Sequence, residues 1–373
     1  MINAKAFSKW TLAGITAATL VACGGSEQSS STETTAAAPA KQETIEWKMV
    51  TTWPKNFPGL GTGAENLANN ITEMSGGRLK VKVYAAGELV PPLEVFDAVS
   101  RGTAQMGHGA AYYWKGKAPA AQFFTAVPFG MTAQEINSWI YHGGGMKLWE
   151  EVYEPFNLKP LTAGNTGVQM GGWFNKEINS LDGFSGLKMR IPGLGGEVLE
   201  KLGGSPINLP GGEIFTALQT GTIDATEWVG PYNDLAFGLY KAAKYYYYPG
   251  WHEPGSEMEL LVNKTAFEAL PKDLQAIVKA ASRQATQDML DEFTALNNDA
   301  LQTLVNEHNV DLRPFPADVL KALKQASQET LEGVAANDEM SAKVYESFKA
   351  FLSKVSDWHE VSERAYINAR DAE

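Results

Sequence analysis

The feature that most constrains the fold is a repeated alternation of short strand-like segments with helices that end at glycine. Residues 45–53 alternate apolar and polar side chains as a strand does, and residues 63–77 follow as an amphipathic helix that ends in Gly-Gly. The same order of segments returns in residues 79–86, 91–102 and 104–110. Parallel strands are usually connected by a helix. This part of the chain therefore predicts a parallel β-sheet covered by helices.

A second group of the same kind occupies the middle of the chain. The expected strands are residues 161–174, 187–192, 205–210, 223–228, 245–248 and 258–267, and the expected helices are 195–204 and 212–221. Residues 161–174 read as one long strand rich in small side chains. From Pro271 onward the sequence is almost wholly helical. We therefore expect an α/β protein of two lobes joined by a hinge, with long C-terminal helices and a ligand cleft between the lobes.

The N-terminus has the pattern of an export signal that ends at a lipid attachment site. Lys5 and Lys9 precede an apolar run over residues 11–22, which is too short to span a membrane. The run ends in Leu-Val-Ala-Cys, which resembles the bacterial lipobox, and its last residue, Cys23, is the only cysteine. We expect residues 1–22 to be a lipoprotein signal peptide and Cys23 to carry the lipid that anchors the protein to a bacterial membrane. The alternative is an unlipidated signal cleaved nearby, with Cys23 incidental.

The composition excludes several classes of function. Residues 23–44 have almost nothing to bury and predict a disordered tether. The net charge of −12 opposes nucleic-acid binding, which needs a basic surface. No disulfide can form if the cysteine carries lipid, so the fold depends on its core alone. A chain of 373 residues that is 44% hydrophobic is long enough for two lobes.

The sequence motifs of common enzyme classes are absent. The five histidines are scattered and no His-Glu-x-x-His occurs, so we expect no zinc site. The sequence also has no Gly-x-Ser-x-Gly and no Gly-Lys-Ser/Thr phosphate loop. Residues 59–64 match Gly-x-Gly-x-x-Ala but lie several residues beyond the first strand, whereas a dinucleotide loop joins strand to helix directly. An exported two-lobe protein without a catalytic motif indicates a solute receptor.

The last predicted helix carries a continuous apolar stripe. From Met340 to Ala365 apolar residues follow one another at steps of three and four. This stripe is longer than a small domain needs to cover itself. The helix lies either across both lobes or against a second subunit.

Several long segments resemble the substrate-binding receptors of tripartite ATP-independent periplasmic (TRAP) transporters. Residues 75–107 contain the strand, the Gly-Glu-Leu and the glycine-terminated helix of these receptors. The segments that resemble the branch binding 2-oxo acids and related hydroxy acids are 164–178, 187–193, 221–234 and 245–255. The resemblance extends from Ile45 to the C-terminus and implies the two-lobe periplasmic binding protein fold. The lipobox departs from the simple cleaved signal that is commoner among these receptors.

The resemblance implies a site made of an arginine and a metal ion. It makes Arg190 the clamp for the ligand's carboxylate, and a planar guanidinium matches a carboxylate through two parallel hydrogen bonds. It makes Gln169, Glu227 and the backbone carbonyl of Trp228 metal ligands, with Glu253 as a weaker fourth and the indole of Trp228 against the solute. Oxygen ligands suit Na⁺ or Ca²⁺. The competing interpretations are a surface ion pair for Arg190, a backbone hydrogen bond for Gln169 and a solvated loop position for Glu253.

Further contacts are expected around this centre. Tyr113 reaches the ligand from the first lobe, with Tyr112 as its rival. Asn233 either hydrogen-bonds near the ligand or caps the following helix. The remaining candidates, which either line the pocket or pack in the core, are Asn165, Trp173 and Phe174.

The expected function is that of a periplasmic, lipid-anchored receptor. It binds a small 2-oxo or 2-hydroxy monocarboxylate such as pyruvate together with Na⁺ or Ca²⁺, and it delivers this solute to the membrane permease of a TRAP transporter. The alternatives are a receptor for a larger carboxylate such as a sugar acid without metal, a periplasmic lyase with Glu227 or Glu253 as its base, and a sensor subunit. We expect membrane contact only through the lipid, and a homodimer through the C-terminal helix, as the resemblance implies.

The expected division of the chain follows the two groups of strands. The first lobe comprises residues 45–167 with 255–296, and the second comprises 168–254 with 297–335. Residues 336–373 form the C-terminal helix.

Overall fold

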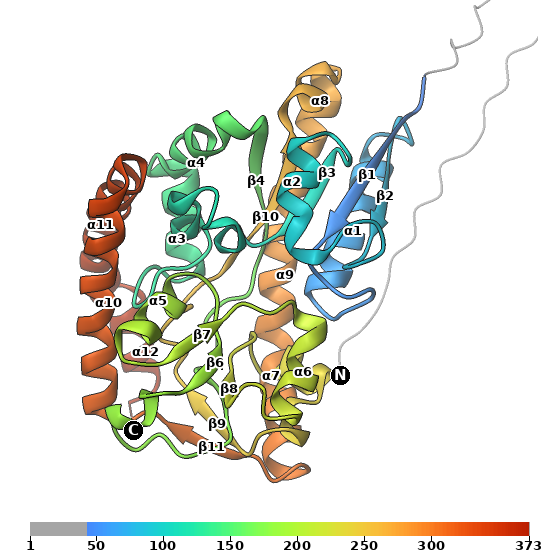
Figure 1. Ribbon diagram of the computed structural model, residues 1–373. Coiled ribbons are helices and arrows are strands. Elements are labelled where there is room, and N and C mark those ends of the chain that lie inside the picture. The colour runs from blue at the N-terminus through green and yellow to red at the C-terminus, as the bar shows by residue number, and fades with distance from the viewer. Residues whose placement is uncertain (1–42, 373) are drawn as a thin grey trace, which may run out of the picture. The chain divides into compact units, whose positions relative to one another are not determined.

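Two β-sheets organise residues 43–372, the part of the chain described by this computed structural model (Figure 1). One sheet has five strands in the order β2-β1-β3-β10-β4, and the other has six in the order β11-β9-β5-β8-β6-β7. Helices pack on both, which confirms the predicted α/β fold of two lobes. The predicted signal peptide, Cys23 and the tether up to residue 42 lie outside the described residues.

The first sheet is mixed, and only its first three strands pair in parallel as predicted. Its strands are β1 (Ile45–Thr51), β2 (Leu79–Tyr84), β3 (Met106–Gly109), β4 (Leu158–Asn165) and β10 (Glu257–Asn263). Strand β1 pairs in parallel with β2 and β3, but β10 is antiparallel to both β3 and β4. The chain returns through β10 after it has formed five of the six strands of the second sheet, and this strand runs against the others.

The second sheet carries the strand ends from which the candidate site is built. Its strands are β5 (Gly172–Phe174), β6 (Lys188–Arg190), β7 (Ser205–Ile207), β8 (Ala225–Thr226), β9 (Tyr245–Tyr248) and β11 (Asp311–Pro314). Strand β6 is parallel to β7 and β8, whereas β5 is antiparallel to β8 and β9. Strand β11 joins the edge in parallel with β9.

The single strand expected over residues 161–174 is wrong. Strand β4 ends at Asn165 in the first sheet, and β5 begins at Gly172 in the second. Gly167 and Gly172 have φ values of +68° and +116°, which side chains with a Cβ rarely adopt. The small residues that suggested a long strand therefore form a crossing from one sheet to the other.

Helices cover the sheets and connect their strands. The α-helices are α1 (Leu60–Met74), α2 (Val95–Ser100), α3 (Ala133–His142), α4 (Gly145–Tyr153), α5 (Gly193–Lys201), α6 (Gly211–Gln219), α7 (Pro231–Phe237), α8 (Lys264–Ala269), α9 (Lys272–Asn306), α10 (Ala317–Asn337), α11 (Glu339–Val361) and α12 (Glu363–Arg370). Short 3₁₀ helices are η1 (Pro92–Glu94), η2 (Ala111–Trp114), η3 (Pro119–Phe124), η4 (Glu154–Phe156), η5 (Leu181–Phe184) and η6 (Leu239–Lys241). None of the helices within the described residues is both long enough and apolar enough to cross a membrane.

Helix α9 connects the cores of the two lobes. It has 35 residues and packs on α1 and β4 beside the first sheet and on α7 beside the second (Figure 1). Val278, near its start, belongs to the core under the first sheet. Phe293 and Leu304, further along, belong to a core that also contains Trp173 and Trp228 of the second lobe. One helix face thus contributes to both lobes.

The predicted C-terminal stripe divides into a packed half and an exposed half. Helix α11 packs on α3, α4 and η3, where Val344 and Phe348 are buried. Further along, Trp358 and Val361 are 62% and 71% exposed. The expected single helix also breaks at Ser362, between α11 and α12. The stripe therefore covers the lobe over only part of its length.

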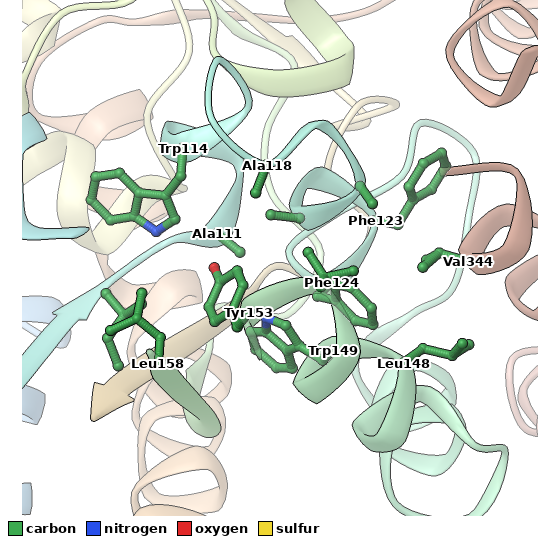
Figure 2. Packing of buried hydrophobic residues seen from close by; sticks show 14 of the residues in the cluster. Ala111, Trp114, Ala118, Phe123, Phe124, Leu148, Trp149, Tyr153, Leu158 and Val344 are labelled. Atoms are coloured by element: carbon green, nitrogen blue, oxygen red, sulfur yellow. The ribbon is translucent and has the colours of Figure 1, made fainter. Parts of the chain in front are cut away.

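An aromatic cluster fills the core below α11 and encloses a buried carboxyl group. The ring of Phe124 stacks on those of Trp139 and Trp149, with centroids 5.3 and 5.0 Å away. Figure 2 shows Trp149 and Tyr153 side by side in this core. Glu259 on β10 accepts hydrogen bonds from the indole of Trp114 and the hydroxyl of Tyr153. Burial raises the pKa of Glu259 to about 7.

The pKa of Glu259 predicts how its substitution changes the pH dependence of stability. Its pKa in the unfolded chain is about 4.3, so between pH 5 and 7 the folded state holds a proton that the unfolded state has released. The free energy of unfolding therefore falls as the pH rises through this window. Glu259→Gln keeps an acceptor and a donor without ionising, and we expect it to reduce this fall by roughly 1 kcal/mol per pH unit.

Urea unfolding at pH 5, 6, 7 and 8 measures this effect. Glu268→Gln, at an exposed position on α8, is the matched control and is expected to leave the slope unchanged. An unaltered slope in Glu259→Gln would show that Glu259 does not hold the proton.

Candidate ligand-binding site

The candidate site is centred on a buried ion pair at the carboxyl ends of β6 and β8. Arg190 is the last residue of β6, and Glu227 directly follows β8. The two strands are parallel neighbours with Arg190 opposite Thr226, so the register itself brings the two side chains together. The guanidinium donates from Nη1 to Glu227 Oε1. Arg190 is 1% exposed and Glu227 is fully buried.

The remaining donors of Arg190 are also engaged. Nε donates to the backbone oxygen of Leu209 at 3.2 Å, and Nη2 donates to the hydroxyl of Tyr113, also at 3.2 Å. Burial would lower the pKa of Arg190, but the carboxylate of Glu227 raises it above its ordinary value. Tyr113 belongs to η2 in the first lobe, so the arginine also connects the lobes.

Gln169 lies in the crossing between the sheets and points an unpaired oxygen into the protein. Its side-chain nitrogen donates to Thr166 Oγ1 at 3.1 Å and to Ser256 Oγ at 3.2 Å. No donor in the described part of the chain reaches its Oε1, although the side chain is buried. A buried carbonyl oxygen without a donor is costly, which makes it a candidate ligand atom.

Glu253 and His252 enter the site from the loop that follows β9. The hydroxyl of Ser256 donates to Glu253 Oε2, and burial together with the charge of Glu227 raises the pKa of Glu253 to about 7. His252 is 2% exposed, and neither of its ring nitrogens has a hydrogen-bond partner among the described residues. One ligand atom from each of Glu227, His252 and Glu253 lies within 4.8 Å of the others.

The chemistry of these groups fits a hard cation. Two buried oxygens, Gln169 Oε1 and Glu227 Oε2, have no hydrogen-bond donor within residues 43–372. A carboxyl oxygen of Glu227 lies close to one of Glu253, and the side-chain nitrogen of Gln169 donates to the same Ser256 hydroxyl that donates to Glu253. Amide and carboxylate oxygens are the ligands that Na⁺ and Ca²⁺ prefer. Gln169, Glu227 and Glu253 therefore have the character that the sequence resemblance implied for metal ligands.

A small cavity beside the ion pair has walls from both lobes. Its lining residues are Trp53, Leu60, Tyr112, Tyr113, Thr166, Gln169, Trp228, Val229 and Met258. The guanidinium of Arg190 lies 5.1 Å from the centre of the Trp228 ring, which closes one side. Both rivals from the sequence, Tyr112 and Tyr113, thus line the cavity. Only Tyr113 hydrogen-bonds Arg190.

The structure places the three remaining pocket candidates in its packed interior. Asn165 donates to Glu257 Oε2 and accepts from the backbone of Gly167, both at 2.9 Å. The indole of Trp173 stacks on Tyr246 at 4.0 Å and donates to Asp234. Phe174 follows Trp173 on β5 and packs against Tyr247 and Phe315. None of the three side chains lines the cavity found among the described residues.

Asn233 connects two lobes and does not cap a helix. Gly230 occupies the N-cap of α7, so the capping interpretation is wrong. The amide nitrogen of Asn233 donates to the backbone oxygen of Pro58 at 2.9 Å, in the loop after β1. Its contribution to the site is to hold the second lobe against the first.

Sequence reasoning missed His252 and Trp53. The five histidines are scattered along the sequence and indicate no zinc site, yet His252 directly precedes Glu253 and belongs to the same cluster of side chains. Trp53 follows β1, and its indole donates to His108 Nδ1 at 2.7 Å, which fixes the ring as a cavity wall. In both cases the available signal was position: each residue sits beside a strand end or a candidate ligand.

Comparison with known proteins places this geometry in a family. Residues 49–338 match the model of bacterial extracellular solute-binding proteins, family 7. A monocarboxylate 2-oxoacid-binding periplasmic protein of Nostoc sp. is 46% identical over 334 residues, which cover 90% of this chain and 91% of that protein.

Solved structures agree with this assignment. A TRAP periplasmic solute-binding protein from Colwellia psychrerythraea, with bound calcium and pyruvate, superposes with a TM-score of 0.85 at 46% identity and covers 88% of this chain and 100% of its own. Another from Pseudoalteromonas atlantica, with bound sodium and pyruvate, has the same TM-score and identity and covers 87% of this chain and 99% of its own. The chain therefore belongs to the family 7 bacterial extracellular solute-binding proteins, the substrate receptors of TRAP transporters.

Proposed function

We propose that this protein binds a small 2-oxo or 2-hydroxy monocarboxylate such as pyruvate together with a hard cation, and delivers it to the permease of a TRAP transporter. The observation that carries the proposal is the pairing of a buried guanidinium with two buried, donor-free oxygens beside one small cavity. An arginine recognises a carboxylate, and free oxygens recognise a cation. The relatives that hold pyruvate with calcium or sodium support the same chemistry.

Each part of the proposed ligand has a matching group in the site. Arg190 would bind the carboxylate through its planar fork. The cation would be held by Gln169, Glu227, Glu253 and the backbone carbonyl of Trp228. Its positive charge would attract the oxygen atoms of the solute. A 2-oxo acid offers its carboxylate oxygen and the adjacent carbonyl oxygen as a chelate. Without the cation, Glu227 would repel the solute in a region of low dielectric.

The alternative functions fit the site less well. A sugar acid bound without metal would leave the donor-free Oε2 of Glu227 without a role. A lyase would use Glu253 as a base, and its pKa of about 7 would suit that task. The family argues against turnover, because its members are solute receptors. We propose that the ligand is released unchanged, which NMR of the solute after prolonged incubation with the protein would check.

We also propose that the hinge divides the chain as the sequence suggested. The first lobe would comprise residues 45–167 with 255–296 and the second 168–254 with 297–335, followed by the C-terminal helices from 336. The strands of each sheet fall within the corresponding ranges. The crossing near Gly167 and the start of β10 near Ser256, which are joined by a backbone hydrogen bond at Thr166, would form the hinge.

Calorimetric titration tests the ligand and its dependence on a cation. Purified protein is stripped of ligand and metal by unfolding and refolding, then titrated with pyruvate, 2-oxobutyrate or lactate in sodium, in calcium, or in neither. We expect tight binding that requires a cation. Removing a direct metal ligand, in Gln169→Ala or Glu227→Ala, should weaken binding by at least about 100-fold.

Gln134→Ala, at an exposed position on α3, is the matched control and should bind like the unaltered protein. Equal affinity with and without cations would remove the metal and leave Arg190 as the anchor. Failure of all three short acids to bind would favour the sugar-acid alternative.

A lipid on Cys23 is the second part of the proposal. The membership in an extracellular family supports export, and the Leu-Val-Ala-Cys sequence supports lipidation. We expect the protein to incorporate labelled fatty acid and to sediment with membranes, because a lipid with two acyl chains anchors a protein stably. Cys23→Ser, which lacks the thiol that accepts the lipid, should incorporate no label. Ser26→Ala serves as the control. A soluble unaltered protein would contradict lipidation.

A homodimer through the C-terminal helices is the third part. Beyond the packed half of α11, the exposed apolar side chains are Trp358, Val361, Tyr366 and Ile367. Beside them, a hollow of about 820 Å³ lies between the C-terminal helices and residues 127–135. A surface of this kind on a soluble receptor suggests a partner, and a second copy of the same helix would cover it.

Light scattering tests the dimer. We expect the unaltered protein to be dimeric at micromolar concentration and the double variant Trp358→Glu with Val361→Glu to be monomeric, because buried charges would oppose association. Ser353→Glu is the matched control: it adds a charge at an exposed position on α11 that lies off the apolar stripe, and it should leave the protein dimeric. A monomeric unaltered protein would contradict the proposal.

A further inference from the structure

His252 is buried in the site without a partner that explains its presence. Its side chain is 1% exposed, and neither Nδ1 nor Nε2 makes a hydrogen bond within the described chain. A buried imidazole without partners is unfavourable, because its polar atoms have lost water and gained nothing. Such a group indicates a contact that another state of the protein completes.

The nearest polar atom identifies that contact. His252 Nε2 lies 3.6 Å from Glu227 Oε2, just beyond hydrogen-bond length. This Oε2 is itself without a donor in residues 43–372, whereas Oε1 of the same carboxylate is held by Arg190. Two unsatisfied atoms of complementary chemistry thus face one another. The ring of Trp251 packs edge-on against His252, with centroids 5.3 Å apart.

Ligand binding would change what holds Glu227. In the structure, the guanidinium of Arg190 donates hydrogen bonds to Glu227, Leu209 and Tyr113. To bind a solute carboxylate through both Nη1 and Nη2, Arg190 would turn Nη1 away from Glu227. The fully buried carboxylate would then lose its present charged partner. The cation would supply the opposite charge, and a neighbouring donor would orient the carboxylate toward it.

We propose that His252 is a positioning residue for Glu227: when Arg190 turns to the ligand, His252 donates from Nε2 to one lone pair of Oε2, and so holds the carboxylate in place with its other lone pairs free to bind the cation. This inference rests on the proposed function. An imidazole with its proton on Nε2 suits the task, because it supplies one directed N–H. A second arginine or lysine would instead place a permanent positive charge beside the cation. The other titratable group close to His252 is Glu253.

The proposal separates two affinities. His252 does not touch the solute carboxylate in this scheme, so its loss should leave the grip of Arg190 intact. The loss of His252 should lower the affinity for the cation, because the carboxylate that binds the cation is no longer oriented. Groups that orient a metal ligand typically change metal affinity by about 10- to 100-fold when removed.

The experiment compares His252→Leu, which removes the donor, with His252→Gln, which keeps an N–H at a similar reach. Pyruvate binding is titrated by calorimetry over a series of calcium concentrations. For His252→Leu we expect the calcium concentration at half-maximal binding to rise about 10- to 100-fold, with the pyruvate Kd at saturating calcium changed less than about 3-fold. His252→Gln should restore most of the calcium affinity. His142→Leu, at an exposed position, is the control.

A double-mutant cycle makes the test independent of folding defects. In a Glu227→Gln background, His252→Leu should cause no further rise in the calcium concentration at half-maximal binding, because the group that it positions is gone. Additive losses would overturn the proposal, as would equal weakening of calcium and pyruvate or a His252→Gln variant as impaired as His252→Leu. If the unaltered protein binds pyruvate without any cation, the receptor stands and this inference falls. If it binds no short acid at all, the proposed function itself fails.

Discussion

The buried pair of Arg190 and Glu227 is the interaction on which the rest of the site depends. Both side chains have left water almost completely, and neither would be tolerated there alone. Their pairing follows from topology, since β6 and β8 are parallel neighbours whose carboxyl ends meet at one edge of the second sheet. Tyr113 extends the pair to the first lobe. The group that would recognise a solute is therefore also one of the contacts that hold the two lobes together.

This dual use limits how the lobes can be joined elsewhere. The elements shared between them are α9 and the crossing between β4 and β5. Helix α9 packs its first part on β4 and its later part on α7, so each lobe keeps its own contacts with it. Asn233 adds a single hydrogen bond from the second lobe to Pro58 of the first. Few polar contacts of this kind are needed if ligand and cation complete the interface on closure.

The sequence predicted the repeating elements well and individual side-chain environments less well. The α/β alternation, the glycine-terminated helices and the positions of Arg190 and Glu227 at strand ends follow from local pattern. Residues 161–174 misled because small residues suit a strand and a sheet-to-sheet crossing equally, and only the positive φ of Gly172 distinguishes them. The sequence could not tell whether Phe174 lines the pocket or packs in the core. Both faces of the short strand β5 are buried, and two buried faces look alike in sequence. His252 was missed because Glu227, the carboxylate that it approaches, is distant along the chain, although Glu253 is its direct neighbour.

Charge balance explains why a site of this composition would favour joint binding of solute and cation. The pair of Arg190 and Glu227 contributes one charge of each sign to a buried region. A carboxylate alone would add uncompensated negative charge there, and a cation alone would add positive charge. Arriving together, the carboxylate can take Arg190 while the cation takes Glu227, so that every charge keeps an opposite partner. The affinity for each must then rise in the presence of the other by the same factor. On the proposed function, the ion pair of Arg190 and Glu227 makes this coupling strong, because either ligand alone would break the pair, whereas both together give each residue a new partner of opposite charge.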